Sequence, residues 1–170
     1  MQDKELALDV GCGYTTGHQP SKEAHIKLDL IRGKANVIAD AHYLPFRSEI
    51  FLKVVMYEVI EHVHHPKQVL SEIYRVLKNG GILELTTPNI MFIGNYFWWI
   101  INPNKLQISD HIYSWRLPEL KNLLQLTGFK ITKFCFIDLP RFWRSARFAR
   151  IFVLPRLTKH HLFIQASKIE

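Results

Sequence analysis

The sequence predicts an α/β fold built on a mostly parallel sheet, and three observations predict it. Short apolar segments of strand type alternate along the chain with segments of helical periodicity. Four early apolar segments, at residues 6–10, 25–30, 36–40 and 53–58, end in or next to an acidic residue. The first of them runs directly into a Gly-x-Gly turn. Because ligands of such sheets bind beyond the carboxyl ends of the strands, these acids and glycines mark the expected site.

The remaining elements follow in order. Residues 66–81 predict a helix, because apolar residues recur at helical spacing with Pro66 in front and Gly80-Gly81 behind. A strand is expected at 82–89, stopped by Pro88. The downstream segments predict a helix within 115–127, a stop at Gly128, a strand over 129–138, a helix at 142–153 and a last strand at 161–168.

Two connections are shorter than this fold usually has. The link "GCGYTTGHQPSKEAH" is short for a full crossover helix. The following link "LIRGKA" is shorter still, whereas parallel neighbours normally need a dozen or more connecting residues. We therefore expect a Rossmann-like sheet with shortened first crossovers, in which loops or a single turn replace the first two helices.

Length and composition favour one soluble domain. The chain has 170 residues with no repeat, no apolar run long enough for a bilayer and no signal-peptide pattern. Its two cysteines suit a reduced, cytoplasmic setting. Residues 1–85 carry 10 Lys/Arg and 11 Asp/Glu, whereas residues 86–170 carry 12 and 4. The basic second half suggests an anionic partner, although a merely solvated basic surface is an equal alternative.

The glycine turn indicates the kind of ligand. Asp9 lies two residues before Gly11, where its carboxylate would repel a pyrophosphate and attract an ammonium group. Asp29 lies 16 residues after Gly13, a position suited to ribose hydroxyls, and Asp40 closes the third strand. A ligand with an adenine, a ribose and a cationic amino acid end fits this row of acids, and S-adenosylmethionine is such a ligand.

Six ordered motifs strengthen this interpretation. The stretches "LDVGCG", "LDL", "ADAHYLPF", "VVMYEVIEHVHHP", "EIYRVLKNGGILELTTPN" and "LPELKNLLQLTGF" resemble those of class I S-adenosylmethionine-dependent methyltransferases. The similarity is greatest to the type 11/type 23 group, which includes quinone, sugar and small-molecule methylases, and covers residues 6 to 136. It implies one methyltransferase domain over 1–170, with a cofactor-binding half at 1–88 and a basic acceptor-side half at 89–170.

The resemblance also implies roles for individual residues. It assigns Asp9, Gly11, Cys12 and Gly13 to the methionine end of the cofactor, and Asp29 and Leu30 to its ribose. It assigns Asp40 and Ala41 to the adenine, and Tyr57 and Glu58 to the transferred methyl. The thiol of Cys12 is interpreted as a bystander between the glycines. The third glycine of the loop stands at Gly17 instead of Thr16, which reshapes the site without abolishing it.

Acceptor-side groups are predicted just beyond the fourth strand. If "EVIEHVHH" is helical, Glu58, Glu61 and His62 share one face, and His111 is a further candidate. Glu61, His62 and His111 are the candidate catalytic residues, with no metal in the preferred interpretation. As an alternative, the four side chains are similar to the metal site of small-RNA 3′-terminal 2′-O-methyltransferases.

The second half offers two further surfaces. The aromatic insertion over 90–115 is interpreted either as a lid over the acceptor or as core packing. The aromatic side chains that would form it are Phe92, Tyr96, Phe97, Trp98 and Trp99. Arginine recurs at every third residue in Arg141, Arg144, Arg147 and Arg150. These side chains are interpreted as contacting a membrane surface, as binding an anionic acceptor, or as a solvated helix face.

The sequence thus predicts a cytoplasmic methyltransferase, peripheral at a membrane in one alternative, that uses S-adenosylmethionine on a small or lipophilic acceptor. Two alternatives stay open: a catalytically silent cofactor-binding module, and a metal-dependent RNA 2′-O-methyltransferase. The oligomeric state and the acceptor itself are left open.

Overall fold

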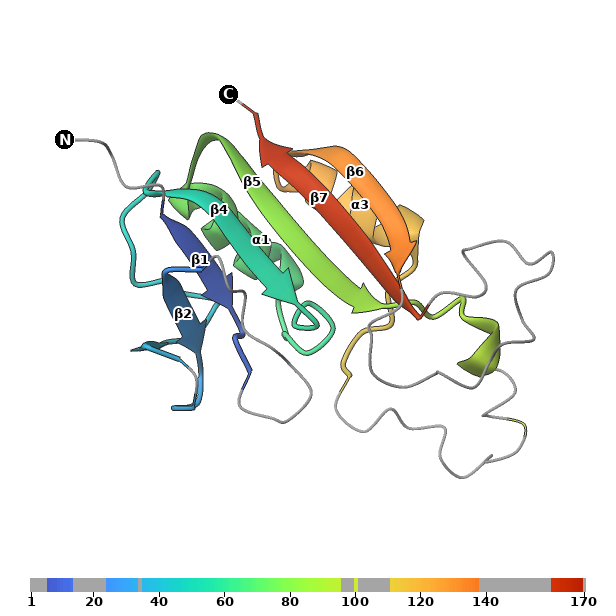
Figure 1. Cartoon of the computed structure of the whole chain (residues 1–170). Helices are drawn as coiled ribbons and strands as arrows, with labels where there is room; N and C mark the ends of the chain where they lie inside the picture. The colour runs from blue at the N-terminus through green and yellow to red at the C-terminus, as the bar shows by residue number, and fades with distance from the viewer. Residues whose placement is uncertain are drawn as a thin grey trace.

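The computed structural model describes residues 6–13, 24–33, 35–95, 100, 111–137 and 160–169. Within these residues, seven strands form one sheet in the order β3-β2-β1-β4-β5-β7-β6 (Figure 1). The strands are β1 (Ala7–Val10), β2 (Ile26–Asp29), β3 (Val37–Ile38), β4 (Phe51–Tyr57), β5 (Leu77–Pro88), β6 (Phe129–Ile137) and β7 (His161–Lys168).

The first five strands are parallel, and the last two are not. β1 pairs with β2 and β4, β2 with β3, and β4 with β5, all in the same direction. β7 runs antiparallel between β5 and β6 and therefore starts at the edge where the parallel strands end. The expected mostly parallel α/β fold is confirmed.

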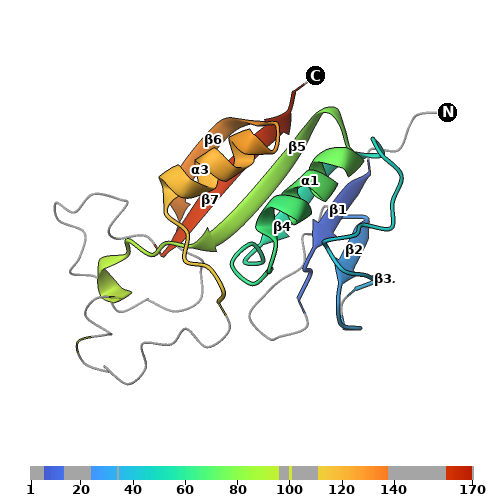
Figure 2. The ribbon, with the colours of Figure 1, turned by 180° about the vertical axis from the view of Figure 1, so that it is seen from behind.

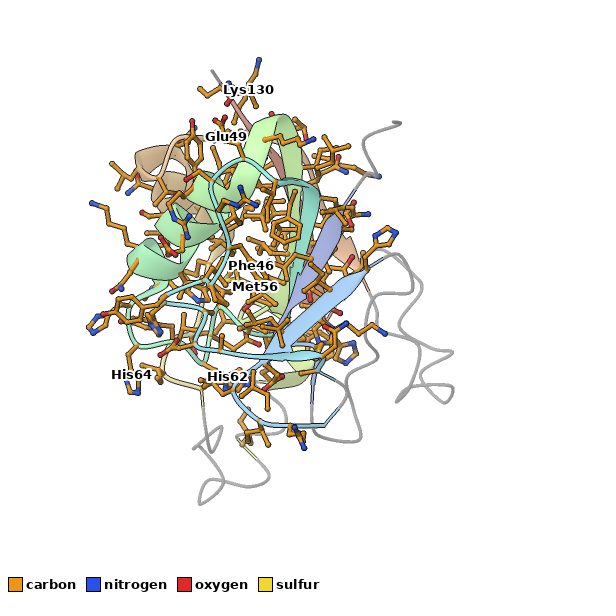
Figure 3. The ribbon with its side chains drawn as sticks, turned by 90° about the vertical axis from the view of Figure 1, so that its left-hand side faces the viewer. Phe46, Glu49, Met56, His62, His64 and Lys130 are labelled. Atoms are coloured by element: carbon orange, nitrogen blue, oxygen red, sulfur yellow. The ribbon has the colours of Figure 1, made fainter. Side chains whose placement is uncertain are left out.

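Two of the described helices cover the same face of the sheet, as the view from behind shows (Figure 2). α1 (Pro66–Val76) buries Val69, Leu70, Ile73 and Val76, and α3 (Leu117–Leu126) buries Leu120 and Leu124. Removing these side chains from water is the main favourable contribution to packing the helices on the sheet. Figure 3 shows Phe46 and Met56 inside this layer and His62 at the end toward which the parallel strands point.

The opposite face of the sheet carries a polar network at its centre. Glu84 of β5 accepts hydrogen bonds from Tyr57 Oη at 3.0 Å and from Gln165 Nε2 at 3.1 Å, and it pairs with Lys53 Nζ at 3.0 Å. Parallel strands buried on both faces are normally apolar on both. The network fits the short early crossovers, because no helix among the described residues lies on this face.

The link between β2 and β3 confirms the shortened crossover. Residues 30–33, 35 and 36 contain no helix, yet β2 and β3 pair in parallel. Thr16 and Gly17 of the first link lie outside the described residues, as do the helix expected at 142–153 and its arginines.

Two expectations about local structure were wrong. The helix over 66–81 ends at Val76, because the fully buried Leu77 is extended, with ψ 137°, and pairs with Phe51 at the start of β5. The segment "EVIEHVHH" is a turn rather than a helix: His62 N–H bonds the Val59 carbonyl at 2.9 Å, and α1 begins only at Pro66. In the described part of the chain, no helix has the length and apolar character needed to cross a bilayer.

Candidate functional site

The three acids of the predicted row lie along one edge of the sheet. β1, β2 and β3 are adjacent and parallel, so their carboxyl ends share that edge. Asp9 lies within β1 and is fully buried, Asp29 is the half-buried last residue of β2, and the exposed Asp40 follows β3 by two residues. The sheet therefore brings the three carboxylates to the place where ligands of this fold class bind.

The glycine turn is anchored to the neighbouring strand. Gly11 N–H and Cys12 N–H both donate to the Leu28 carbonyl, at 2.8 and 3.2 Å. Gly11 and Gly13 have φ angles of 72° and 86°, in the left-handed region that glycine tolerates. A Cβ at Gly11 would also overlap the Cγ2 atom of Val59. Glycine is required at this position by backbone angle and by space.

Asp29 holds the turn and keeps acceptor capacity. One oxygen accepts from Gly13 N–H at 3.0 Å, and the other accepts from Ile31 N–H at 3.2 Å. A carboxylate offers about four acceptor positions. Counting the bonds made by the described residues, two positions are left for hydroxyl groups of a ligand at this edge, and these residues fit a ribose. Leu30, beside it, is 67% exposed.

Asp40 is the start of a hydrogen-bonded chain. Its Oδ1 atom lies 2.6 Å from His42 Nδ1 and accepts from His42 N–H, and these bonds hold the pKa of Asp40 below its ordinary value. His42 Nε2 in turn accepts from His65 N–H at 3.2 Å. Because Nε2 is an acceptor, the proton of a neutral His42 ring lies on Nδ1, facing Asp40. This series of hydrogen bonds fixes the Asp40 carboxylate beside the half-buried Ala41.

Cys12 has no features of a nucleophile. It is fully buried, and burial, with the nearby charges of Asp29 and Asp9, raises the pKa of its thiol to about 11. The thiolate is the reactive form of cysteine, so Cys12 stays inert near neutral pH.

Three of the four predicted acceptor-side residues come together. The ligand atoms of Glu61, His62 and His111 all lie within 4.8 Å of one another. Glu61 is buried, accepts from Thr87 Oγ1 at 3.1 Å, and lies 3.9 Å from His62 Nε2. The His62 and His111 rings meet edge to face at 4.6 Å. The Glu61 carbonyl also accepts two backbone N–H groups, from residues 112 and 113, which draw in the segment that carries His111.

Glu58 and Tyr57 take other partners. Glu58 Oε2 lies 3.3 Å from His161 Nε2, so Glu58 is not part of the Glu61 group. The Tyr57 hydroxyl donates to Glu84 on the helix-free face. Sequence reasoning missed His161, which could have been found only by recognising that an antiparallel last strand begins at the site edge.

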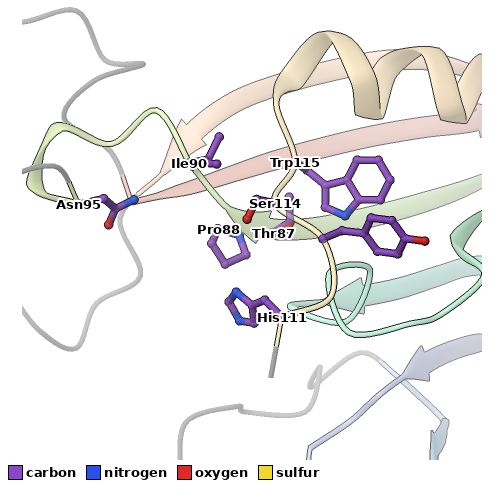
Figure 4. A pocket seen from close by; sticks show the side chains of 8 residues that line it. Thr87, Pro88, Ile90, Asn95, His111, Ser114 and Trp115 are labelled. Atoms are coloured by element: carbon purple, nitrogen blue, oxygen red, sulfur yellow. The ribbon is translucent and has the colours of Figure 1, made fainter. Parts of the chain in front are cut away.

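A small pocket opens next to these groups (Figure 4). It lies between the end of β5 and the segment before α3, and its lining is Thr87, Pro88, Ile90, Asn95, His111, Tyr113, Ser114 and Trp115. Within the aromatic insertion, Phe92 packs on the His160 ring at 3.8 Å, while Tyr96, Phe97, Trp98 and Trp99 lie outside the described residues.

The sequence was compared with protein families and with curated proteins. Residues 8–85 match the family model of the methyltransferase domain. A demethylmenaquinone methyltransferase of Protochlamydia amoebophila is 37% identical in an alignment 111 residues long, and the alignment covers 55% of this chain and 46% of the relative. The chain spans between 41% and 64% of the length of three curated relatives that it matches.

Solved structures agree on the fold. An S-adenosylmethionine-dependent methyltransferase of Archaeoglobus fulgidus superposes with a TM-score of 0.68 at 20% identity, covering 96% of this chain and 86% of the other. A Haloferax volcanii protein, solved in complex with the Trm112 methyltransferase activator, gives 0.69 at 16% identity and covers 100% and 84%. At these identities the likeness shows the fold.

Proposed function

From the match of residues 8–85 to the family model of the methyltransferase domain, we propose that this protein transfers a methyl group from S-adenosylmethionine to a small, lipophilic acceptor. The observation that carries the proposal is the Asp29 carboxylate, held at the end of β2 by two backbone N–H groups, with acceptor positions left for a ribose. When bound, S-adenosylmethionine supplies an electrophilic methyl on a sulfonium.

Each acidic residue along the edge is assigned to a different part of the cofactor. Asp9 and the Gly11–Gly13 turn face its methionine end, where the buried carboxylate favours an ammonium group. Asp29 binds the ribose, and Asp40, already oriented by His42, is placed for the adenine amino group. These assignments keep residues 1–88 as the cofactor-binding half of a single domain.

The acceptor is assigned to the other half, residues 89–170. The pocket of Figure 4 borders the carboxyl edge, and Pro88, Ile90 and Trp115 give it an apolar wall. Displacement at a sulfonium depends strongly on how the acceptor is positioned. Glu61, His62 and His111 are proposed to orient the acceptor, and the relative named demethylmenaquinone methyltransferase supports a lipophilic one.

Calorimetry with S-adenosylmethionine and S-adenosylhomocysteine tests the cofactor. Losing one hydrogen bond to a charged group costs about 1.5–3 kcal/mol, so Asp29→Asn is expected to weaken both affinities about tenfold to hundredfold. The matched control is Glu49→Gln, an exposed acid at the opposite end of the molecule, which is expected to bind like wild type (Figure 3). An Asp29→Asn protein with unchanged affinity contradicts the ribose assignment.

A radiolabelled-methyl screen over lipid, RNA and metabolite fractions tests the acceptor. Label in the lipid fraction is the expected result. Cofactor binding without any transfer would instead identify a silent module. The grouping of Glu61, His62 and His111 favours a second candidate, metal-dependent methylation of RNA. That candidate predicts label in RNA that requires added Mn²⁺ and is abolished by a chelator.

A further inference from the structure

Glu58 and His161 form a pair at the site edge. Glu58 follows β4, and His161 opens β7, opposite Pro88 of the pocket wall. Glu58 Oε2 lies 3.3 Å from His161 Nε2, and the two side chains are 22% and 21% exposed. The pair thus connects the end of the parallel sheet to the acceptor-side wall.

Glu58 is held in an unfavourable backbone conformation. Its φ of 56° is left-handed, which is uncommon and unfavourable for a residue with a Cβ. The Glu58 N–H bond to the Thr86 carbonyl, at 3.0 Å, ties this conformation to the end of β5. Such strain is concentrated at functional sites, where surrounding structure maintains it for the sake of side-chain placement.

Each member of the pair has an unused polar atom. Glu58 Oε1 and His161 Nδ1 are buried and make no hydrogen bond with the residues that the structure describes. Leaving such a buried atom unsatisfied destabilises the fold. Because the carboxylate is an acceptor, it selects the ring form with its proton on Nε2, and Nδ1 then carries a lone pair. A hydrogen-bond donor, such as a hydroxyl group of a ligand, would satisfy this nitrogen.

We propose that His161 Nδ1 is the proton acceptor for a hydroxyl group of the methyl acceptor, with Glu58 as its positioning residue. This rests on the proposed function and deepens it, since it makes the acceptor an alcohol, phenol or hydroquinol. The O–H bond breaks as its proton passes to Nδ1, and the oxygen pair forms the bond to the methyl carbon. The C–S bond breaks with its electron pair going to sulfur, giving S-adenosylhomocysteine. The imidazolium, compensated by the Glu58 carboxylate, later returns the proton to water.

The step can be tested without knowing the natural acceptor. 4-Nitrocatechol is an acidic phenol whose absorption moves to longer wavelength when a hydroxyl ionises. With S-adenosylhomocysteine present, at a pH where the free probe is mostly neutral, the wild-type protein is expected to raise the ratio of ionised to neutral probe about tenfold. His161→Gln and Glu58→Gln are expected to lose this shift. His64→Gln, which changes an exposed imidazole outside the site, is expected to keep it.

Nitrogen NMR of the His161 ring separates positioning from general structure. The neutral wild-type ring is expected to carry its proton on Nε2, and Glu58→Gln is expected to abolish that preference while the remaining spectrum stays folded. Absence of probe ionisation by wild type, or full ionisation by His161→Gln, overturns the proposal. Calorimetry with S-adenosylmethionine on the same samples tests the proposed function separately. Intact cofactor binding with no probe ionisation refutes only the His161 step.

Discussion

Replacement of Gly11 by alanine is predicted to destabilise the protein by two separable effects. The left-handed φ of 72° costs a residue with a Cβ about 1–2 kcal/mol. The new methyl also overlaps Val59 Cγ2, and overpacking typically costs about 1–3 kcal/mol. The sum, about 2–5 kcal/mol, corresponds to a fall in Tm of roughly 4–20 °C for a chain of this size.

Gly80 provides a matched control. Its φ of 75° is nearly the same, but a Cβ there would meet nothing within 4 Å. Gly80→Ala is therefore expected to cost only the backbone part, about 1–2 kcal/mol. Urea unfolding followed by circular dichroism gives both free energies, and their difference isolates the overlap.

A double-mutant cycle with Val59→Ala checks the steric reasoning. If the overlap is real, truncating Val59 relieves it, and Gly11→Ala costs about 1–3 kcal/mol less in that background. Equal losses for Gly11→Ala and Gly80→Ala, together with a coupling energy near zero, would refute the reasoning.

Three further outcomes are expected. Cys12 should resist maleimide at pH 8, because it is buried and its pKa is raised to about 11, and mass spectrometry should show it labelled only in urea, with Cys135 as internal comparison. The Arg75 bond lowers the pKa of Glu72, so the stability it gives is present above the ordinary value of 4.5 and is lost as pH falls below it. Urea titrations from pH 6 to 3 should therefore show a shallower acid loss of unfolding free energy for Glu72→Gln than for wild type; an unchanged slope contradicts the linkage. Lys168→Met should lower the free energy of unfolding by about 1–3 kcal/mol, because Lys168 Nζ donates to the Leu77 carbonyl at 2.9 Å in a buried site; a thermal melt equal to wild type would exclude this.

Local patterns predicted the strands and the row of acids well. The alternation of apolar segments determined the strand positions, and parallel pairing brings strand ends together whatever lies between them. Asp9, Asp29 and Asp40 could be placed on one edge for that reason. The last strand, 161–168, has the predicted bounds.

Contacts between distant segments could not be predicted in the same way. α1 ends where it does because Leu77 pairs with Phe51 of β4. The apolar periodicity of the helix residues carries no information about this contact with a distant strand. The 58–65 segment resembles a helix in composition, yet the backbone carbonyl of its Glu61 accepts N–H groups from residues 112 and 113, some fifty positions later in the sequence. The pairing of Glu58 with His161 likewise spans most of the chain.

The position of β7 has a consequence for how the chain is assembled. β7 separates β5 from β6, so β6 has no strand to join until residues 161–168 have left the ribosome. We expect β6 and α3 to wait undocked during synthesis, while the parallel strands made earlier can already pair. A stop codon before residue 161 should release a protein that loses this whole edge of the sheet and exposes Leu83 and Leu85 of β5 to proteases.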